Sequence, residues 1–236
     1  MQAELIYAAP DSTMAEYERL RKIANEATAI DVQAKIQSGG IGRNGHSWHS
    51  PLGGLWLTAD LIHPMAQASF ALYVGSCLHR LLISLFGLKD LSIKWTNDIY
   101  HRDSKLAGIL CKYSSSQNRY VFGIGINLNN LPDPLLNEYR GTSLKAILGF
   151  DISIQTFKRL LLESIRAHAG ELNQPSLYLD YCDEHLYGKG RACRIDTGAQ
   201  IQGGSIEGID ELGNLILKDA PGNRQIISHG SILGID

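Results

Sequence analysis

The sequence has few cysteines, and the four present include no C-x-x-C pair. They are Cys77, Cys111, Cys182 and Cys193. Their separations match neither zinc ligands nor a disulfide framework, so we expect reduced side chains that serve mainly in packing. The eight histidines also lack the spacing of a metal-binding triad. No metal site built from protein side chains alone is therefore predicted.

Long apolar runs and an excess of positive charge are missing as well. No stretch reaches the roughly 18 consecutive apolar residues of a membrane-spanning helix. Residues 1–5 have neither the basic nor the apolar region of a signal peptide. A formal net charge of −2 provides no broad basic surface for nucleic acid. We expect a cytoplasmic protein that binds neither membranes nor nucleic acids.

The most informative segment is residues 37–48, which read QSGGIGRNGHSW. Glycine lets backbone N–H groups approach a ligand closely, and Arg43 offers a planar fork of donors to a phosphate or carboxylate. The segment therefore predicts an anion-binding loop, with an ordinary surface turn as the alternative.

Two known phosphate motifs overlap this glycine loop, and neither fits. Gly40, Gly42 and Gly45 spell the dinucleotide pattern G-x-G-x-x-G, which requires a helix to begin at the third glycine. Pro51 and the glycine pair at 53–54 would break such a helix. The same stretch lacks the lysine of a P-loop. The sequence argues against both motifs.

The rest of the chain alternates strand and helix patterns. A helix is predicted from Thr13 to Ala27, because Thr13 and Glu16 fit a capping box. The alternation at 30–35 predicts a strand that leads directly into the glycine loop. Further strands are expected at 55–61, 91–95, 106–113 and 120–126, and further helices at 64–86, 143–148, 154–172 and 176–186.

The pattern changes near residue 188 to short apolar runs separated by glycines, which is typical of a small β-barrel. We therefore predict two domains, at 1–187 and 188–236.

Four sequence blocks occur in an order typical of one family. They are GIGRNGHSWHSP at 40–51, KWTND at 94–98, KLAGIL at 105–110 and GIGIN at 123–127. The chain thereby resembles the biotin protein ligases, whose blocks read roughly G-R-G-R-x-G-R-x-W-x-S-P, K-W-P-N-D, K-L-x-G-I-L and G-I-G-x-N. One block alone would be weak evidence, but four in order with family-like spacing are specific. The similarity runs from about Asp11 to the C-terminus.

The resemblance implies a fold and an activity. The fold is α+β, with a catalytic domain like that of class II aminoacyl-tRNA synthetases, a mixed sheet, and an SH3-like C-terminal β-barrel. The activity is ATP-dependent formation of biotinyl-5′-AMP, followed by transfer of biotin to a lysine of a biotin carboxyl carrier protein from acetyl-CoA carboxylase or a related carboxylase. Too few residues precede Asp11 for the family's DNA-binding domain, so a monofunctional form is expected. A homodimer is compatible with the resemblance.

The catalytic residues implied are cations and one carboxylate. Attack of a carboxylate on the α-phosphate brings two anions together, so the site needs positively charged side chains. Arg43, Lys94 and Lys105 meet this requirement. By resemblance Arg43 contacts the biotin carboxylate and α-phosphate, Lys105 holds one of these anions, and Asp98 lies near the nucleotide. Mg²⁺ should arrive with ATP near Asp98 rather than occupy a dedicated protein site.

The binding positions are carried over in the same way. For biotin they are Ser12, Thr13, Gln37, Gly39, Gly40, Arg43, Trp48, Lys105 and Gly108. For the nucleotide they are Arg43, His46, Trp48, Asn97, Lys105 and Asn127. Helix capping is the alternative for Ser12 and Thr13, and a turn at a strand end is the alternative for Asp98 and Asn127.

Three residues depart from the family pattern. Ile41 replaces the first arginine of the glycine loop, His46 the last, and Thr96 the proline of K-W-P-N-D. Ile41 removes a donor, and His46 carries only a partial charge at neutral pH. We expect a working but weaker enzyme. The alternatives are a lipoate or octanoate ligase of the same fold, or a catalytically weakened module that binds nucleotide or carrier protein.

Overall fold

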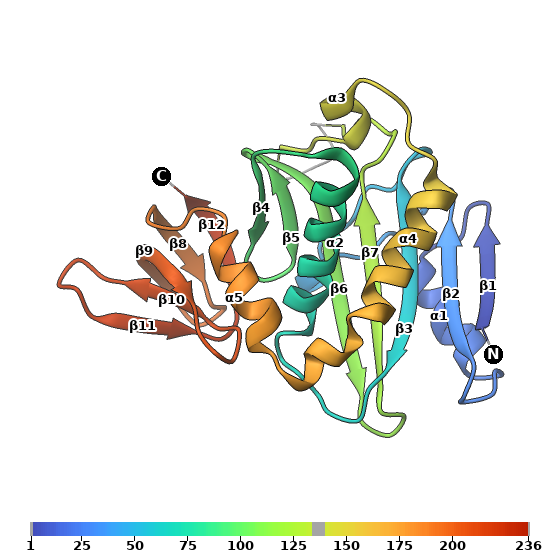
Figure 1. The fold of residues 1–236 in the computed structure, drawn as a ribbon, viewed down its shortest axis with the longest axis horizontal. Helices are drawn as coiled ribbons and strands as arrows, with labels where there is room; N and C mark the ends of the chain where they lie inside the picture. Colours follow the sequence, from blue (N-terminus) through green and yellow to red (C-terminus); the bar gives the residue numbers. More distant parts are fainter. Residues whose placement is uncertain (1, 134–139, 236) are drawn as a thin grey trace.

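The computed structural model describes residues 2–133 and 140–235. A seven-stranded mixed sheet has the order β1-β2-β3-β7-β6-β5-β4, in which only the β1–β2 pair is parallel (Figure 1). Its strands are β1 Gln2–Tyr7, β2 Ala29–Ala34, β3 Leu55–Ile62, β4 Leu91–Lys94, β5 Asp98–His101, β6 Ser104–Ser114 and β7 Arg119–Ile126.

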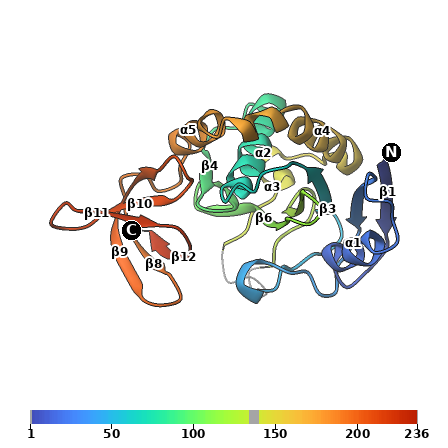
Figure 2. The ribbon, with the colours of Figure 1, turned by 90° about the horizontal axis from the view of Figure 1, so that it is seen from below.

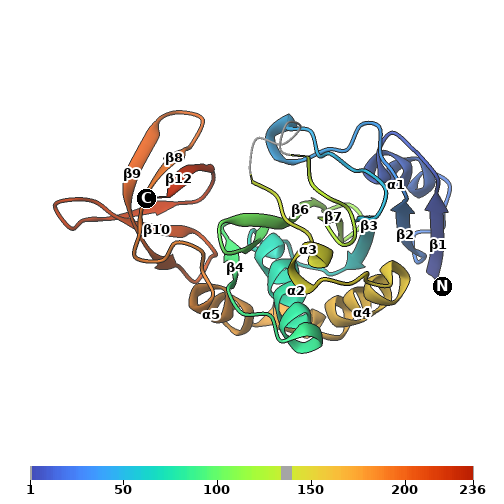
Figure 3. The same cartoon turned by 90° about the horizontal axis from the view of Figure 1, so that it is seen from above.

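Helices cover the two faces of this sheet unequally. The helices are α1 Thr13–Arg21, α2 Phe70–Phe86, α3 Leu144–Leu148, α4 Ile154–Ala167 and α5 Ser176–Glu184, with short 3-10 turns at Arg43–Gly45 and Ala169–Asn173. Helices α2, α4 and α5 lie on one face, whereas α1 and the glycine loop lie on the other (Figures 2 and 3). The sheet therefore has a helix face and a loop face.

The core follows this division. On the helix face, Tyr73 and Leu78 of α2 pack with Phe122 and Ile124 of β7 and Leu161 of α4. A smaller cluster on the loop face joins α1 to β2 and β7, and contains Met14, Tyr17, Ile30, Val32 and Val121. Burial of apolar side chains on both faces stabilises the sheet and holds α1 against β2 and β7.

The C-terminal segment forms a second, antiparallel sheet beside the β4 edge of the first (Figure 1). Its order is β11-β10-β9-β8-β12, and its strands are β8 Ala192–Asp196, β9 Ile201–Ile209, β10 Leu215–Lys218, β11 Arg224–Ile227 and β12 Ser231–Ile235. The predicted α+β fold with a mixed sheet, helices and a C-terminal β-domain is confirmed. Closure of this sheet into a barrel and the boundary at 187–188 stay predictions.

Several helices are shorter than the sequence pattern predicts. Helix α4 ends at Ala167 rather than at residue 172, with a separate 3-10 turn after it, and α5 ends at Glu184 rather than at residue 186. Helix α1 ends at Arg21 rather than near Ala27, because the Arg21 guanidinium binds the carbonyls of Asn25 and Thr28 and holds 22–28 as a loop. Its N-cap is Ser12, whose hydroxyl accepts from the Met14 N–H, so the capping box of Thr13 and Glu16 is wrong.

Helix α2 is shortened at its start, which lies at Phe70 rather than at Pro64. The Tyr120 hydroxyl binds both the Met65 carbonyl and the Gln67 N–H, which holds the preceding residues in turns. No helix in 2–133 or 140–235 has the length and apolarity needed to cross a lipid bilayer.

The buried His79 of α2 makes the fold sensitive to acid. Its Nδ1 lies 2.9 Å from the Tyr181 hydroxyl of α5, and burial lowers its pKa from 6.5 to about 4, with His185 and Arg80 acting in the same direction. Between these pH values the unfolded chain binds a proton that the folded chain does not. Stability therefore falls as the pH falls through this window and levels off below the folded pKa.

We expect the substitution His79→Gln to remove part of this acid sensitivity, up to about 3 kcal/mol for a fully buried imidazole. Urea unfolding at pH 7.5 and pH 4.5 would measure it, with the wild-type chain as the control. An equal loss of stability between the two pH values in both proteins would contradict the assignment to His79.

Candidate active site

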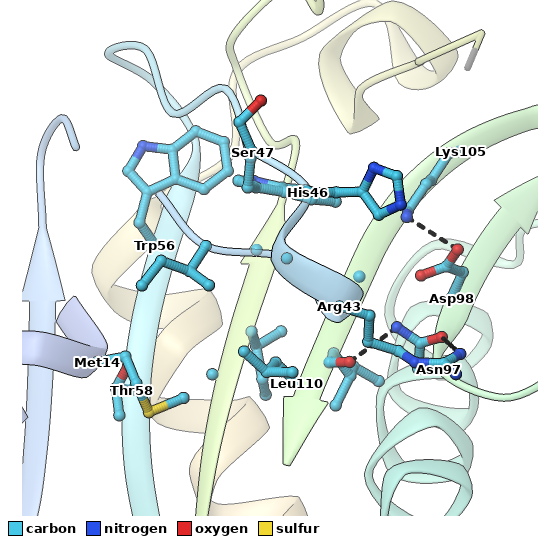
Figure 4. A pocket seen from close by; sticks show the side chains of 18 of the residues that line it. Met14, Arg43, His46, Ser47, Trp56, Thr58, Asn97, Asp98, Lys105 and Leu110 are labelled. Carbon is cyan, nitrogen blue, oxygen red and sulfur yellow. Dashed lines mark hydrogen bonds and ion pairs between the residues drawn. The ribbon is translucent and has the colours of Figure 1, made fainter. Parts of the chain in front are cut away.

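A cavity of about 210 Å³ opens on the loop face of the seven-stranded sheet. Its lining comes from the start of α1, the glycine loop, strands β3 to β7 and the start of β12. Figure 4 shows part of it, with labelled side chains from α1, the glycine loop, β3, β5 and β6. The predicted site residues that line it are Ser12, Thr13, Gln37, Arg43, His46, Trp48, Lys94, Asn97, Asp98, Lys105 and Gly108. Residues separated by almost a hundred positions in the chain are thus brought to one place.

Glycines in β6 and β7 make room for Trp48. A Cβ atom at Gly125 would lie 2.6 Å from Trp48 Nε1, and one at Gly108 would lie 2.8 Å from its Cζ3. The ring of Trp56 meets that of Trp48 edge to face, with centroids 6.5 Å apart. The two tryptophans form an apolar wall of the cavity.

One end of the cavity is cationic. Lys105 Nζ lies 2.8 Å from Asp98 Oδ2 and 5.0 Å from the centre of the Trp48 ring. Burial lowers the pKa of Lys94, and the nearby charge of Lys105 lowers it further. The Asp98 carboxylate acts in the opposite direction and raises this pKa. Burial also lowers the pKa of Arg43, opposed by Asp98, although a guanidinium stays protonated at neutral pH. Three cationic groups facing one carboxylate favour an anionic ligand here.

Arg43 reaches from the glycine loop to two other elements. Its Nη1 donates to Thr96 Oγ1 at 2.6 Å and to Asn97 Oδ1 at 3.0 Å, and its Nη2 donates to the Gly230 carbonyl at 3.0 Å. The loop is therefore fastened to the turn before β5 and to the turn before β12.

The opposite end, at the start of α1, is polar but neutral. The Thr13 N–H and hydroxyl donate to Gln37 Oε1 at 2.8 and 3.1 Å, and Gln37 Nε2 donates to Ser50 Oγ at 2.7 Å. The Thr58 hydroxyl donates to that of Thr13. Ser12 lines the cavity and also caps α1, so its two predicted roles coexist. Fixed neutral groups at this end suit a neutral polar part of a ligand.

Three predicted residues lie outside the lining. Gly39 and Gly40 shape the loop, since the Gly39 N–H donates to the Asp11 carbonyl and the Gly40 carbonyl accepts from the Trp48 N–H, both at 2.8 Å. Asn127 follows β7, is buried, and accepts from Asn130 Nδ2 at 2.9 Å. Their predicted ligand contacts stay predictions.

Several lining residues were missed by the sequence reasoning. Thr58, Gly123 and Gly125 were not singled out, although the glycines belong to the GIGIN block and the block itself was a signal. Ser231 and Ile232 come from the second sheet, and no local pattern marks them.

Comparisons with known proteins agree with this architecture. A model of the biotin/lipoate A/B protein ligase family matches residues 7–129, and one of the biotin protein ligase C-terminal domain matches residues 189–234. A biotin--[acetyl-CoA-carboxylase] ligase from Paracoccus denitrificans is 30% identical over 237 residues, covering 93% of this chain and 95% of the relative. The chain belongs to the biotin protein ligase family.

Two further proteins show how the chain compares in length and in fold with its relatives. The bifunctional ligase/repressor BirA of Escherichia coli is 28% identical over 198 residues, and the aligned part spans 78% of this chain but only 60% of BirA. The biotin protein ligase from Aquifex aeolicus in complex with biotin and ATP has the same fold, with a TM-score of 0.84 and 24% identity over 99% of this chain and 98% of that one.

Gly40 and Gly39 of the glycine loop should respond differently to substitution by alanine. A Cβ at Gly40 would lie 2.3 Å from the Trp48 carbonyl oxygen, whereas one at Gly39 would have its nearest atom, Asp11 O, at an ordinary 3.5 Å. We expect Gly40→Ala to lower the free energy of unfolding by about 1–3 kcal/mol. It should also speed tryptic cleavage after Arg43. Gly39→Ala is the matched control, and equal effects in urea unfolding and limited proteolysis would contradict this reading of the loop.

Proposed function

We propose that this protein is an ATP-dependent ligase that activates biotin as biotinyl-5′-AMP and transfers the biotinyl group to a lysine of a biotin carboxyl carrier protein. The observation that carries the proposal is the single cavity with a neutral polar end at α1 and a cationic end at Arg43, Lys94 and Lys105. Biotin has the matching chemistry, since it joins a neutral ureido ring to a carboxylate.

The ureido ring is rigid and needs a few fixed donors and acceptors within an apolar pocket. Thr13 and Gln37 hold each other in place, and Trp48 and Trp56 provide apolar surface beside them. Bound with its ring at α1, biotin points its carboxylate toward Arg43 and Lys105, which lie at the other end of the cavity (Figure 4).

In the first step a biotin carboxylate oxygen attacks the α-phosphorus of ATP, the bond to the bridging oxygen breaks, and pyrophosphate leaves. The two reacting groups are both anions, so fixed cations lower the barrier by stabilising the negative charge in the transition state. Arg43, Lys94 and Lys105 provide those charges. In the second step a neutral lysine amine of the carrier attacks the acyl carbon, the bond from that carbon to the phosphate oxygen breaks, AMP leaves with the electron pair, and the nitrogen releases one proton to solvent.

Mg²⁺ is proposed to bind together with ATP, near Asp98. Asp98 Oδ1 is buried and has no hydrogen-bond partner within the described ranges, while its Oδ2 binds Lys105. A single free carboxylate oxygen suits a hard cation that keeps most of its other ligands from phosphate and water. The described residues hold no group of three histidine, cysteine or acidic side chains placed for a metal. Mg²⁺ bound there would neutralise charge on the phosphates.

The finer assignments are also proposals. The carrier would belong to acetyl-CoA carboxylase or a related carboxylase, and pairing into a homodimer and a cytoplasmic location stay predictions.

Exchange of labelled pyrophosphate into ATP tests the proposal, because it reports acid activation without a carrier protein. We expect exchange with biotin and none with lipoate or octanoate. Exchange with lipoate or octanoate alone would move the protein to the related ligases of those acids. No exchange with any of the three acids would indicate a binding module in which catalysis is lost.

Removal of the charge of Lys105 should slow this exchange. We expect Lys105→Met to lower the exchange rate roughly 100-fold or more, as loss of one group that stabilises transition-state charge does in other enzymes. Lys112→Met is the matched control, since Lys112 is exposed on the same strand. Because Lys105→Met leaves the Asp98 carboxylate without its Lys105 partner, urea unfolding of both lysine variants separates lost catalysis from lost stability. Equal rates in the two single lysine variants would contradict the role of Lys105.

A further inference from the structure

Thr96 occupies the position at which the family block K-W-P-N-D has proline. Threonine brings a hydroxyl group that proline lacks, and this hydroxyl lies 2.6 Å from Arg43 Nη1. A departure from the family pattern thus makes a direct contact with the cation of the glycine loop.

The contact belongs to a network of hydrogen bonds in which the donor and acceptor of each bond are determined. Asn97 Nδ2 donates to the Ile109 carbonyl of β6 at 2.9 Å, so its Oδ1 faces Arg43. The Thr96 hydroxyl donates to the same Oδ1 at 3.3 Å, which leaves its lone pairs for the Arg43 guanidinium. Strand β6 therefore determines where both acceptors point.

The third acceptor comes from the second sheet. Arg43 Nη2 donates to the Gly230 carbonyl, and Asn44 Nδ2 donates to Ser231 Oγ at 3.3 Å. Gly230 has a φ of +144°, and a Cβ there would lie 2.8 Å from the Asp196 carbonyl oxygen. Only glycine fits without strain, so the direction of this carbonyl is set by the turn between β11 and β12.

Arg43 is the single arginine or lysine between residues 39 and 47. Ile41 and His46 stand where the family pattern has further arginines. A long side chain on a loop loses rotamer entropy when it binds a ligand. Three neutral acceptors fix the guanidinium beforehand without cancelling its charge. They use three of the five N–H groups of an arginine, which leaves two for an anion.

We propose that Thr96 is a positioning residue that, together with Asn97 and the Gly230 carbonyl, holds Arg43 ready for the phosphate of the acyl-adenylate. The identity of this anion rests on the proposed function. The positioning itself rests on the hydrogen bonds that Arg43 donates to Thr96, Asn97 and Gly230.

Thr96→Val removes the hydroxyl at almost constant volume, and Thr96→Ser retains it. We expect preformed biotinyl-5′-AMP to leave the Thr96→Val protein roughly tenfold faster than the wild type, as for loss of one hydrogen bond to a charged group, and to leave Thr96→Ser at nearly the wild-type rate. In an Arg43→Met background, Thr96→Val should have no further effect, because it acts through Arg43. A wild-type release rate in Thr96→Val, or the same tenfold factor in the Arg43→Met background, would overturn the proposal.

A second readout does not depend on activity. In ¹⁵N NMR spectra of the ligand-free protein, we expect separate Nη resonances for the immobilised Arg43 guanidinium in wild type and Thr96→Ser, and averaged resonances in Thr96→Val. Identical Arg43 spectra in all three proteins would overturn the positioning role. If the wild type forms no biotinyl-5′-AMP, the proposed function fails and these spectra alone decide whether Thr96 holds Arg43.

Discussion

Repulsion between like charges is the constraint on which the whole site depends. Arg43, Lys94 and Lys105 line one cavity, where partial burial weakens the screening by water. Among the described residues that line the cavity, Asp98 alone opposes them with a full negative charge. Aromatic rings and neutral oxygens stabilise the cations further. Lys105 lies over the Trp48 ring, and Lys94 lies 5.0 Å from the centre of the Tyr100 ring. Arg43 donates to an amide oxygen, a hydroxyl and a backbone carbonyl. The cavity thus keeps a positive field without a carboxylate for each cation.

The sheet makes this arrangement possible because its two faces differ. Phe122 and Ile124 of β7 point into the apolar core beneath α2, whereas Gly123 and Gly125 alternate with them toward the cavity. The side-chain period of two in a strand places bulk on one face and none on the other. Trp48 lies against the glycine surface. The same strand therefore contributes to stability on one side and to ligand space on the other.

Sequence reasoning reached the fold and most of the cavity because both depend on local patterns. Short strand-like apolar segments marked β3, β6 and β7, and the four blocks contained most of the charged and polar lining. What it missed depends on contacts between distant segments. Arg43 and Gly230 are 187 positions apart, and nothing near Gly230 indicates an arginine partner. The start of α2 was also wrong, because the Tyr120 hydroxyl holds the preceding residues in turns.

The apolar core passes from the first sheet into the second without a break, since Ile195, Ile206 and Leu217 belong to the same buried cluster as the residues around α2. At its margin the Trp95 indole N–H donates to the Gly213 carbonyl at 2.9 Å, and the Asp183 carboxylate accepts from the Ile209 N–H at 2.9 Å. The C-terminal segment therefore cannot be exchanged for that of another relative without changes on the catalytic side. A chimera that joined it to another relative's catalytic sheet would have to bring matching residues on both sides of the junction, or leave apolar surface and amide groups exposed.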